Sequence, residues 1–188
     1  MAVGSKPEVP DLARIADTLA RHRVEYLLVG GVAARAHGAR RLTYDVDCVA
    51  ARAEGNLDRL AWAMRDLHAR LRVEGLSDDE AALLPVHLSG ATLARMEIST
   101  WRTDAGDLDV LADIPDRQGR HLSYEELATR AAELDLDGLV LRVAALEDVI
   151  ASKEWADRPK DRAALDELRS LRQRDSPEPD ESQLHQEG

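Results

Sequence analysis

Two short motifs constrain the fold of this chain more than any other feature: the glycine pair Gly30-Gly31 and the sequence Asp45-Val46-Asp47. The apolar run Tyr26 to Val29 predicts a short buried strand that leads directly into the glycine pair. The two aspartates flank an apolar residue on a segment that continues as Cys48-Val49-Ala50, which predicts a second strand. Side chains two residues apart on a strand point to the same face, so we expect Asp45 and Asp47 to lie close together.

This pairing of carboxylates indicates a particular chemistry. Two carboxylates side by side repel each other unless a cation lies between them. Mg²⁺ suits such a pair, because it prefers hard oxygen ligands and is often shared with substrate phosphates. A glycine pair lets the backbone approach phosphates where a side chain would block it. The combination indicates phosphoryl or nucleotidyl transfer. The alternative is a solvated edge strand beside an ordinary glycine turn.

The remaining pattern predicts an α+β fold, a small mixed sheet with helices packed on it and a C-terminal helical pair. We expect one domain over residues 1–174, with a core at 24–143, a helical extension at 144–174 and a disordered acidic tail at 175–188. The predicted helices are 10–22, 32–36, 57–71, 123–134, 145–155 and 159–173. The predicted strands are 26–29, 42–49, 92–101, 107–111 and 139–143, with a loop at 76–79.

Composition limits the classes of function. The net charge of −11 argues against a protein that coats nucleic acid broadly. Residues 175–188 hold five acidic and no basic side chains, which leaves 25 basic against 31 acidic side chains in the body. Arg35, Arg40 and Arg41 form a local basic cluster between the two motifs, which fits phosphate binding or a solvated loop. The single Cys48 excludes an internal disulfide. We find no signal-peptide pattern and no apolar run of the ~18 residues a membrane span needs, so we expect a cytoplasmic protein.

Three further polar residues lie where the pattern favours apolar ones. Asp109 lies mid-strand among aliphatic residues and is preferred as a third carboxylate over Asp107, which has the same strand parity but lies nearer the turn. Lys153 and Asp161 lie on the apolar faces of the last two helices. They would form a structural ion pair, or Lys153 would reach a triphosphate while Asp161 orients it or the incoming hydroxyl.

A few other side chains fit either a packing or a binding role. His37 precedes the helix-ending Gly38 and is typical of a residue that caps carbonyl groups, with substrate contact as the alternative. Tyr44, Trp101 and Trp155 are candidates for stacking a base, or for packing in a chain without phenylalanine.

These motifs together resemble the nucleotidyltransferase superfamily, which has the fold of DNA polymerase beta and of aminoglycoside nucleotidyltransferases. The resemblance covers roughly residues 12–172 and is closest to the AbiEii/MenT-like group of type IV toxins. The segments that carry it are Leu28-Val29-Gly30-Gly31, the run from His37 to Asp47, and Lys153 with Arg158-Pro159-Lys160-Asp161. Aminoglycoside-modifying relatives typically carry Gly-Ser and Ser-Asp-x-Asp, whereas this chain has Gly-Gly and Thr-Tyr-Asp-Val-Asp.

The resemblance implies a mechanism that uses these residues. Asp45, Asp47 and Asp109 would hold Mg²⁺, and Asp109 would help to activate the attacking hydroxyl. Gly30 and Gly31 would receive the phosphates of an NTP. Lys153 with Arg40 or Arg41 would neutralise the charge of the departing pyrophosphate. Thr43 lies on the same strand face as Asp45 and is assigned to the nucleotide site.

The leading hypothesis is a toxin that transfers a nucleotide from NTP to the 3′ end of tRNA and so blocks translation, with a cognate antitoxin as its partner. A second hypothesis is nucleotide transfer to a small molecule, such as an aminoglycoside, or to a protein. A third is a binding module or antitoxin without catalysis, in which the aspartates are structural.

Overall fold

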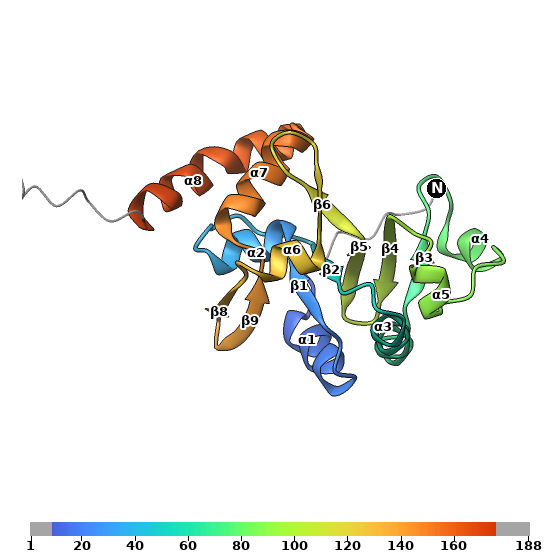
Figure 1. The fold of residues 1–188 in the computed structure, drawn as a ribbon. Helices are drawn as coiled ribbons and strands as arrows, with labels where there is room; N and C mark the ends of the chain where they lie inside the picture. Colours follow the sequence, from blue (N-terminus) through green and yellow to red (C-terminus); the bar gives the residue numbers. More distant parts are fainter. Residues whose placement is uncertain (1–8, 176–188) are drawn as a thin grey trace, which may run out of the picture.

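A computed structural model describes residues 9–175 as a mixed seven-stranded sheet, a separate two-stranded sheet and eight helices (Figure 1). The strand order of the large sheet is β3-β4-β5-β2-β1-β9-β8. The strands are β1 Tyr26–Leu28, β2 Asp45–Ala50, β3 Arg70–Arg72, β4 Ile98–Thr103, β5 Gly106–Leu111, β6 Asp113–Pro115, β7 His121–Ser123, β8 Ala132–Leu136 and β9 Leu139–Val143. The helices are α1 Leu12–Arg21, α2 Gly30–Ala36, α3 Glu54–Asp66, α4 Asp78–Ala82, α5 Gly90–Leu93, α6 Tyr124–Ala128, α7 Leu146–Ala156 and α8 Pro159–Asp175.

The centre of the sheet is the unit β1-α2-β2. β1 pairs antiparallel with β2, and β2 pairs parallel with β5, so the aspartate-bearing strand is covered on both edges. Val46, Cys48 and Ala50 alternate with the aspartates and are buried. This alternation fixes the register, because a slip of one residue would bury the carboxylates and expose the apolar set.

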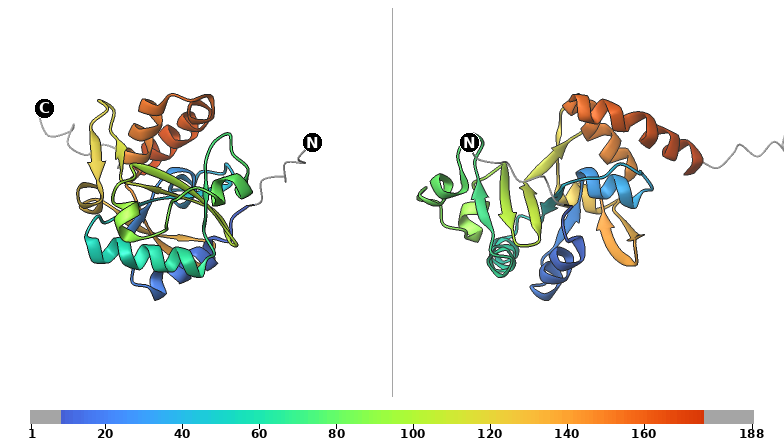
Figure 2. Two further views of the ribbon diagram at one scale, coloured as in Figure 1. Left: turned by 90° about the vertical axis from the view of Figure 1, so that its right-hand side faces the viewer. Right: turned by 180° about the vertical axis from the view of Figure 1, so that it is seen from behind.

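Two pairs of helices flank the strands. Figure 1 shows α7 and α8 above the sheet and α1 and α3 below it, and the left view of Figure 2 shows the same arrangement from the side. α1 packs against α3, and α7 packs against both α2 and α8. Each has an apolar stripe that enters the common core, for example Ile15 and Leu19 of α1 and Val149 and Ile150 of α7. None of the helices between residues 9 and 175 is long and apolar enough to cross a membrane.

The structure confirms the α+β class and corrects several predicted elements. The second strand begins at Asp45 rather than at 42, and the helix predicted at 57–71 ends at Asp66 before β3. The strand predicted at 92–101 divides into α5 and β4, because Ser89 caps a short helix there by accepting from Thr92 N. The loop predicted at 76–79 contains the start of α4, which has the capping box Ser77–Glu80. The tail residues 176–188 lie outside the described residues.

The helix predicted at 123–134 is also wrong in its second half. Its capping box, Ser123 with Glu126, is present, but α6 ends at Ala128. The segment Ala132–Leu136 is instead strand β8, whose side chains alternate between half-buried and exposed. Asp137 and Gly138 connect it to β9 with positive φ at both residues, 56° and 86°, as a two-residue hairpin turn requires.

Candidate active site

Three carboxylates converge where β2 and β5 run side by side. Asp45 and Asp47 project from β2, and Asp109 is the register partner of Asp47 on β5. One oxygen from each of the three lies within 4.8 Å of the others. Asp107 is the register partner of Asp45 but does not belong to this group; Arg72 (2.5 Å) and Arg102 (3.5 Å) bind its carboxylate instead.

The burial and close approach of these carboxylates raise the pKa of two of them, Asp47 and Asp109. Burial, together with the charges of Asp45 and Asp109, raises the pKa of Asp47 to about 6, although a backbone hydrogen bond from Gly31 and the charge of Lys160 oppose this. Burial also raises the pKa of Asp109, against a hydrogen bond from Thr100. Oδ1 of Asp109 is buried without any hydrogen-bond partner. A buried acceptor without a partner is costly, so this oxygen is suited to a ligand that the protein itself does not supply.

The donor set fits a divalent cation. All three groups are carboxylates, and no histidine or thiol joins the cluster within the described residues. Hard oxygen donors of this kind suit Mg²⁺ rather than a softer metal. A cation would relieve the mutual repulsion of the three groups and would give Oδ1 of Asp109 a partner. The residues present therefore fit the metal that the sequence implies.

The glycine pair makes room for two of the site's own side chains. Gly30 has φ +58°, and a Cβ there would lie 2.0 Å from Oδ2 of Asp47. A Cβ on Gly31 would lie 2.4 Å from Oγ1 of Thr43. The Thr43 hydroxyl donates to Oδ1 of Asp45 at 2.7 Å, so Thr43 orients a carboxylate of the cluster. The two motifs of the sequence are thus in direct contact.

A cleft of about 330 Å³ opens on one side of the carboxylates, with the glycine pair along its wall. Four cationic side chains of the described residues line it, from the loop after α2, the last turn of α7, the α7–α8 connection and the first turn of α8: Arg41, Lys153, Arg158 and Lys160. Among residues 9–175, Asp161 is the only acid that lines it besides the three converging aspartates. The lining beyond those three therefore has an excess of positive charge, which suits a polyanion such as a triphosphate.

The structure brings nearly all of the predicted site residues to this cleft. Gly30, Gly31, Arg41, Thr43, Asp45, Asp47, Asp109, Lys153 and Asp161 all line it. Arg40 does not; it is exposed, and its backbone N–H donates to Glu167 of α8 at 2.9 Å. Tyr44 lines the cleft and is 46% exposed, so its ring is available to a ligand.

Asp161 holds two of the cations in place. Its side chain is 1% exposed and accepts from Lys153 Nζ at 3.3 Å and from Arg158 Nε at 2.6 Å. Burial would raise the pKa of Asp161, but the hydrogen bond from Arg158 and the charge of Lys153 outweigh it and keep that pKa low. The predicted ion pair is present, and because it borders the cleft it also positions the two cations there.

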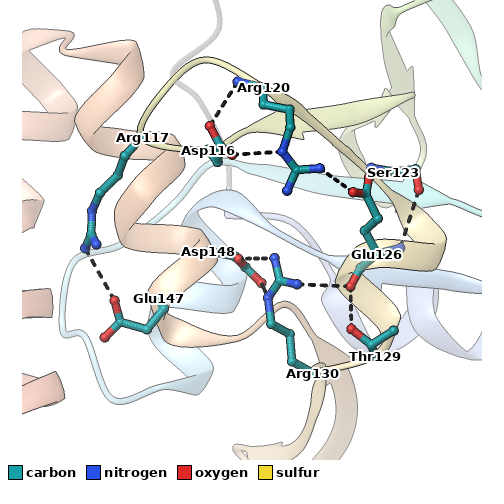
Figure 3. Close-up of polar contacts among 9 residues, drawn as sticks. All are labelled: Asp116, Arg117, Arg120, Ser123, Glu126, Thr129, Arg130, Glu147 and Asp148. Atoms are coloured by element: carbon teal, nitrogen blue, oxygen red, sulfur yellow. Dashed lines mark hydrogen bonds and ion pairs between the residues drawn. The ribbon is translucent and has the colours of Figure 1, made fainter.

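Helix α7, which carries Lys153, is tied to α6 and to the β6–β7 hairpin by charged side chains (Figure 3). Arg130 binds the buried Asp148 of α7 through two bonds of 2.7 and 2.8 Å. Arg117 of the hairpin contacts Glu147 and Glu154 of the same helix. These contacts fix the helix relative to the sheet and so fix the position of Lys153.

Arg158 and Lys160 were not predicted as site residues. Both flank Pro159 at the start of α8, and Lys160 immediately precedes Asp161. The available signal was the dense run of charges beside an aspartate already singled out. His37 has a structural role, since its Nε2 lies 2.8 Å from the carbonyl oxygen of Ala144, the residue after β9. Trp101 is buried and donates to Ser99, so it is a packing residue.

No family model matches this chain, and no curated protein matches it in sequence. Solved structures do match it in fold. The lincosamide antibiotic adenylyltransferase LnuA, bound to lincomycin, superposes with a TM-score of 0.58 at 14% identity, over 86% of this chain and 96% of that one. The antibiotic-resistance factor ANT(2″)-Ia superposes with a TM-score of 0.53 at 13% identity, over 87% and 88%. ANT(2″)-Ia in complex with adenylyl-2″-tobramycin gives 0.53 at 15% identity, over 87% and 93%. The chain has the nucleotidyltransferase fold.

Proposed function

We propose that this protein is a Mg²⁺-dependent nucleotidyltransferase that transfers a nucleotide from NTP to a small-molecule acceptor. One observation carries the proposal: three converging carboxylates, one with an unpartnered buried oxygen, line a cleft together with four cations. A metal site beside a polyanion site is what transfer from a nucleoside triphosphate requires. The nucleotidyltransferase fold supports the same assignment.

The cleft residues take distinct roles in this proposal. Asp45 and Asp47, with Asp45 oriented by Thr43, would hold the cation, and the cation would supply a Lewis acid to the phosphate oxygens. The acceptor hydroxyl would attack the α-phosphorus as the bond to pyrophosphate breaks. Asp109 would complete the cation site and take the proton of the acceptor hydroxyl. Lys153 and Arg41 would neutralise the charge on pyrophosphate.

The choice of a small-molecule acceptor has support from two sides. Among the structural neighbours named above, LnuA is a lincosamide antibiotic adenylyltransferase and ANT(2″)-Ia is an antibiotic-resistance factor solved with adenylyl-2″-tobramycin. The chain as a whole is acidic, which disfavours a large polyanionic acceptor. The sequence interpretation of a toxin that acts on tRNA and is paired with an antitoxin has neither support, and we place it second.

The test is a transfer assay with each α-labelled NTP, Mg²⁺ and three separate acceptors: lincomycin, tobramycin and total tRNA. We expect the label to enter a small molecule and to require Mg²⁺. The variant Asp45→Asn/Asp47→Asn should abolish transfer, whereas Asp17→Asn/Asp166→Asn, with the same change in charge at exposed sites, should retain it.

Label in tRNA alone, lost in the Asp45→Asn/Asp47→Asn variant, would replace our acceptor with the toxin hypothesis. Absence of transfer to all three acceptors, together with absence of Mg²⁺–NTP binding by the folded protein, would overturn the enzymatic proposal itself.

A further inference from the structure

A second cleft opens on the other side of the carboxylates, over β4 and β5. Its volume is about 650 Å³, and it shares Tyr44, Asp45 and Asp109 with the cleft lined by the cations. It continues past Arg72, Thr100 and Arg102 into a further hollow of about 910 Å³ beside the β3–α4 loop. We call these two connected hollows the acidic groove. An acceptor in it would have direct access to Asp109, whose Oδ1 lacks a partner in the protein.

The sign of the charge reverses across the three carboxylates. Beyond the converging trio, six acids line the acidic groove: Asp11, Glu74, Asp78, Asp79, Asp104 and Asp107. In the part of the chain that the structure describes, only two cations line it, Arg72 and Arg102. Both are engaged, Arg72 with Asp107 and Arg102 with Asp78 and Asp107. The acidic groove therefore keeps a net negative charge of about four, whereas the cleft on the other side is cationic.

Some of these acids are available to a ligand. The carboxylates of Glu74 and Asp79 are exposed and form no hydrogen bond or ion pair with any residue between 9 and 175. Asp104 is also exposed, but His68 and Arg70 engage its carboxylate at 2.6 and 3.4 Å. These carboxylates follow the groove away from the reacting centre, where they would meet the distant parts of an acceptor rather than its attacking hydroxyl.

We infer that the acidic groove binds the acceptor and selects one that carries protonated amines, with at least one hydroxyl presented to Asp109. This inference rests on the proposed function and narrows its acceptor to a cationic hydroxylated molecule. The charge distribution disfavours nucleic acid in the same groove, because each phosphate would add repulsion along its length.

The experiment compares two probes with one skeleton, the linear trimer of glucosamine and its fully N-acetylated form. Binding is measured by calorimetry on the full chain with Mg²⁺ and a non-hydrolysable NTP analogue, at a pH below the pKa of the amines. We expect the cationic trimer to bind roughly tenfold or more tightly than the neutral one.

Two triple variants locate the source of this preference. Glu74→Gln/Asp79→Asn/Asp104→Asn removes three groove acids and should reduce the preference to near unity. Glu125→Gln/Glu133→Gln/Asp166→Asn makes the same change in net charge at exposed sites outside the groove and should leave it intact. Thermal denaturation checks that both variants are folded.

Equal binding of the two trimers, binding of neither, or equal loss in the two triple variants would overturn the inference. Tighter binding of total tRNA than of the cationic trimer would also overturn it. The analogue is titrated first, so the two proposals fail separately: if it binds with Mg²⁺ and the trimer does not, only the acceptor class is wrong. If the analogue does not bind, both the proposed function and this inference, which rests on it, are wrong.

Discussion

The carboxyl group of Asp47 links stability to metal binding at the scale of a single residue. Its pKa is about 6 in the folded chain against an ordinary value of 3.8, so the folded state binds a proton more readily than the unfolded one between these pH values. The free energy of unfolding of the metal-free protein should therefore fall as pH rises through this window. The expected loss is on the order of 3 kcal/mol.

Denaturant titrations at several pH values in EDTA measure this fall. Mg²⁺ should restore stability above about pH 6, where Asp47 is charged, and should do little below pH 4. Asp47→Asn should remove most of the pH dependence in this window, and an undiminished slope in that variant would contradict the assignment.

Asp109 should show opposite effects on stability and on activity. Asp109→Asn removes one of three mutually repelling charges and so should raise the free energy of unfolding in EDTA by about 1 kcal/mol. The same change should lower kcat by at least about a hundredfold, since the amide cannot take the proton of the acceptor hydroxyl. Denaturant titration and single-turnover transfer measure the two effects. A variant that is both less stable and fully active would contradict this role.

The turn between β1 and α2 is the element that most tightly constrains the site. Gly30→Ala should cost at least about 2 kcal/mol more than Gly75→Ala. Both glycines have positive φ, but only at Gly30 would the new methyl group meet Asp47, whereas Gly75 faces open space. Calorimetric unfolding of the two variants compares the costs. Similar costs would mean that backbone strain alone explains the glycine and that the contact with Asp47 does not matter.

The ion pair that holds α7 and the exposed ion pairs that connect the β6–β7 hairpin to α6 should differ strongly in their contribution to stability. Arg130→Met leaves the buried Asp148 without its partner and should cost about 3 kcal/mol or more. Arg120→Met removes exposed contacts with Asp116 and Glu126 and should cost less than about 1 kcal/mol. Urea unfolding of both variants tests the difference. Equal costs would show that the Arg130–Asp148 pair is not what fixes the helix.

Local sequence patterns predicted some helices and strands correctly and failed to predict others. The strand before the glycine pair and the last two helices have strong patterns and were confirmed within a few residues. Strand β9 was predicted with its observed bounds, whereas β8 was missed because the capping box at Ser123 favoured a helix over the same residues. A capping box specifies where a helix begins but carries no information on its length.

Across the whole molecule, the site combines parts of the chain that no local pattern connects. The Asp-x-Asp motif was visible in the sequence, but its partner Asp109 depends on β5 pairing parallel with β2. The choice of Asp109 over Asp107 follows from that register and from the arginines that engage Asp107. Arg158 and Lys160, at the start of α8, reach the cleft because α8 packs on α7 and α7 packs on α2, and sequence periodicity does not specify these tertiary contacts.

Opposite charge on the two sides of the carboxylates is likewise a property of the whole fold. The cations come from the loop after α2 and from the C-terminal helices with their connection, whereas the groove acids come from β5, from the loops after β3 and β4, from the start of α4 and from the residue before α1. A net charge of −11 does not reveal this separation. The separation of charge predicts a protein that binds a polyanion in the cationic cleft and disfavours polyanions in the acidic groove.

The most direct test of this account is a calorimetric titration of the protein with ATP, and then with the other NTPs, in the presence and absence of Mg²⁺. The account predicts binding that requires Mg²⁺, that Lys153→Met weakens about tenfold or more, and that Asp45→Asn/Asp47→Asn abolishes in a folded protein. NTP binding that is equally tight in EDTA and in that double variant would contradict the central claim that the three carboxylates form a metal–nucleotide site.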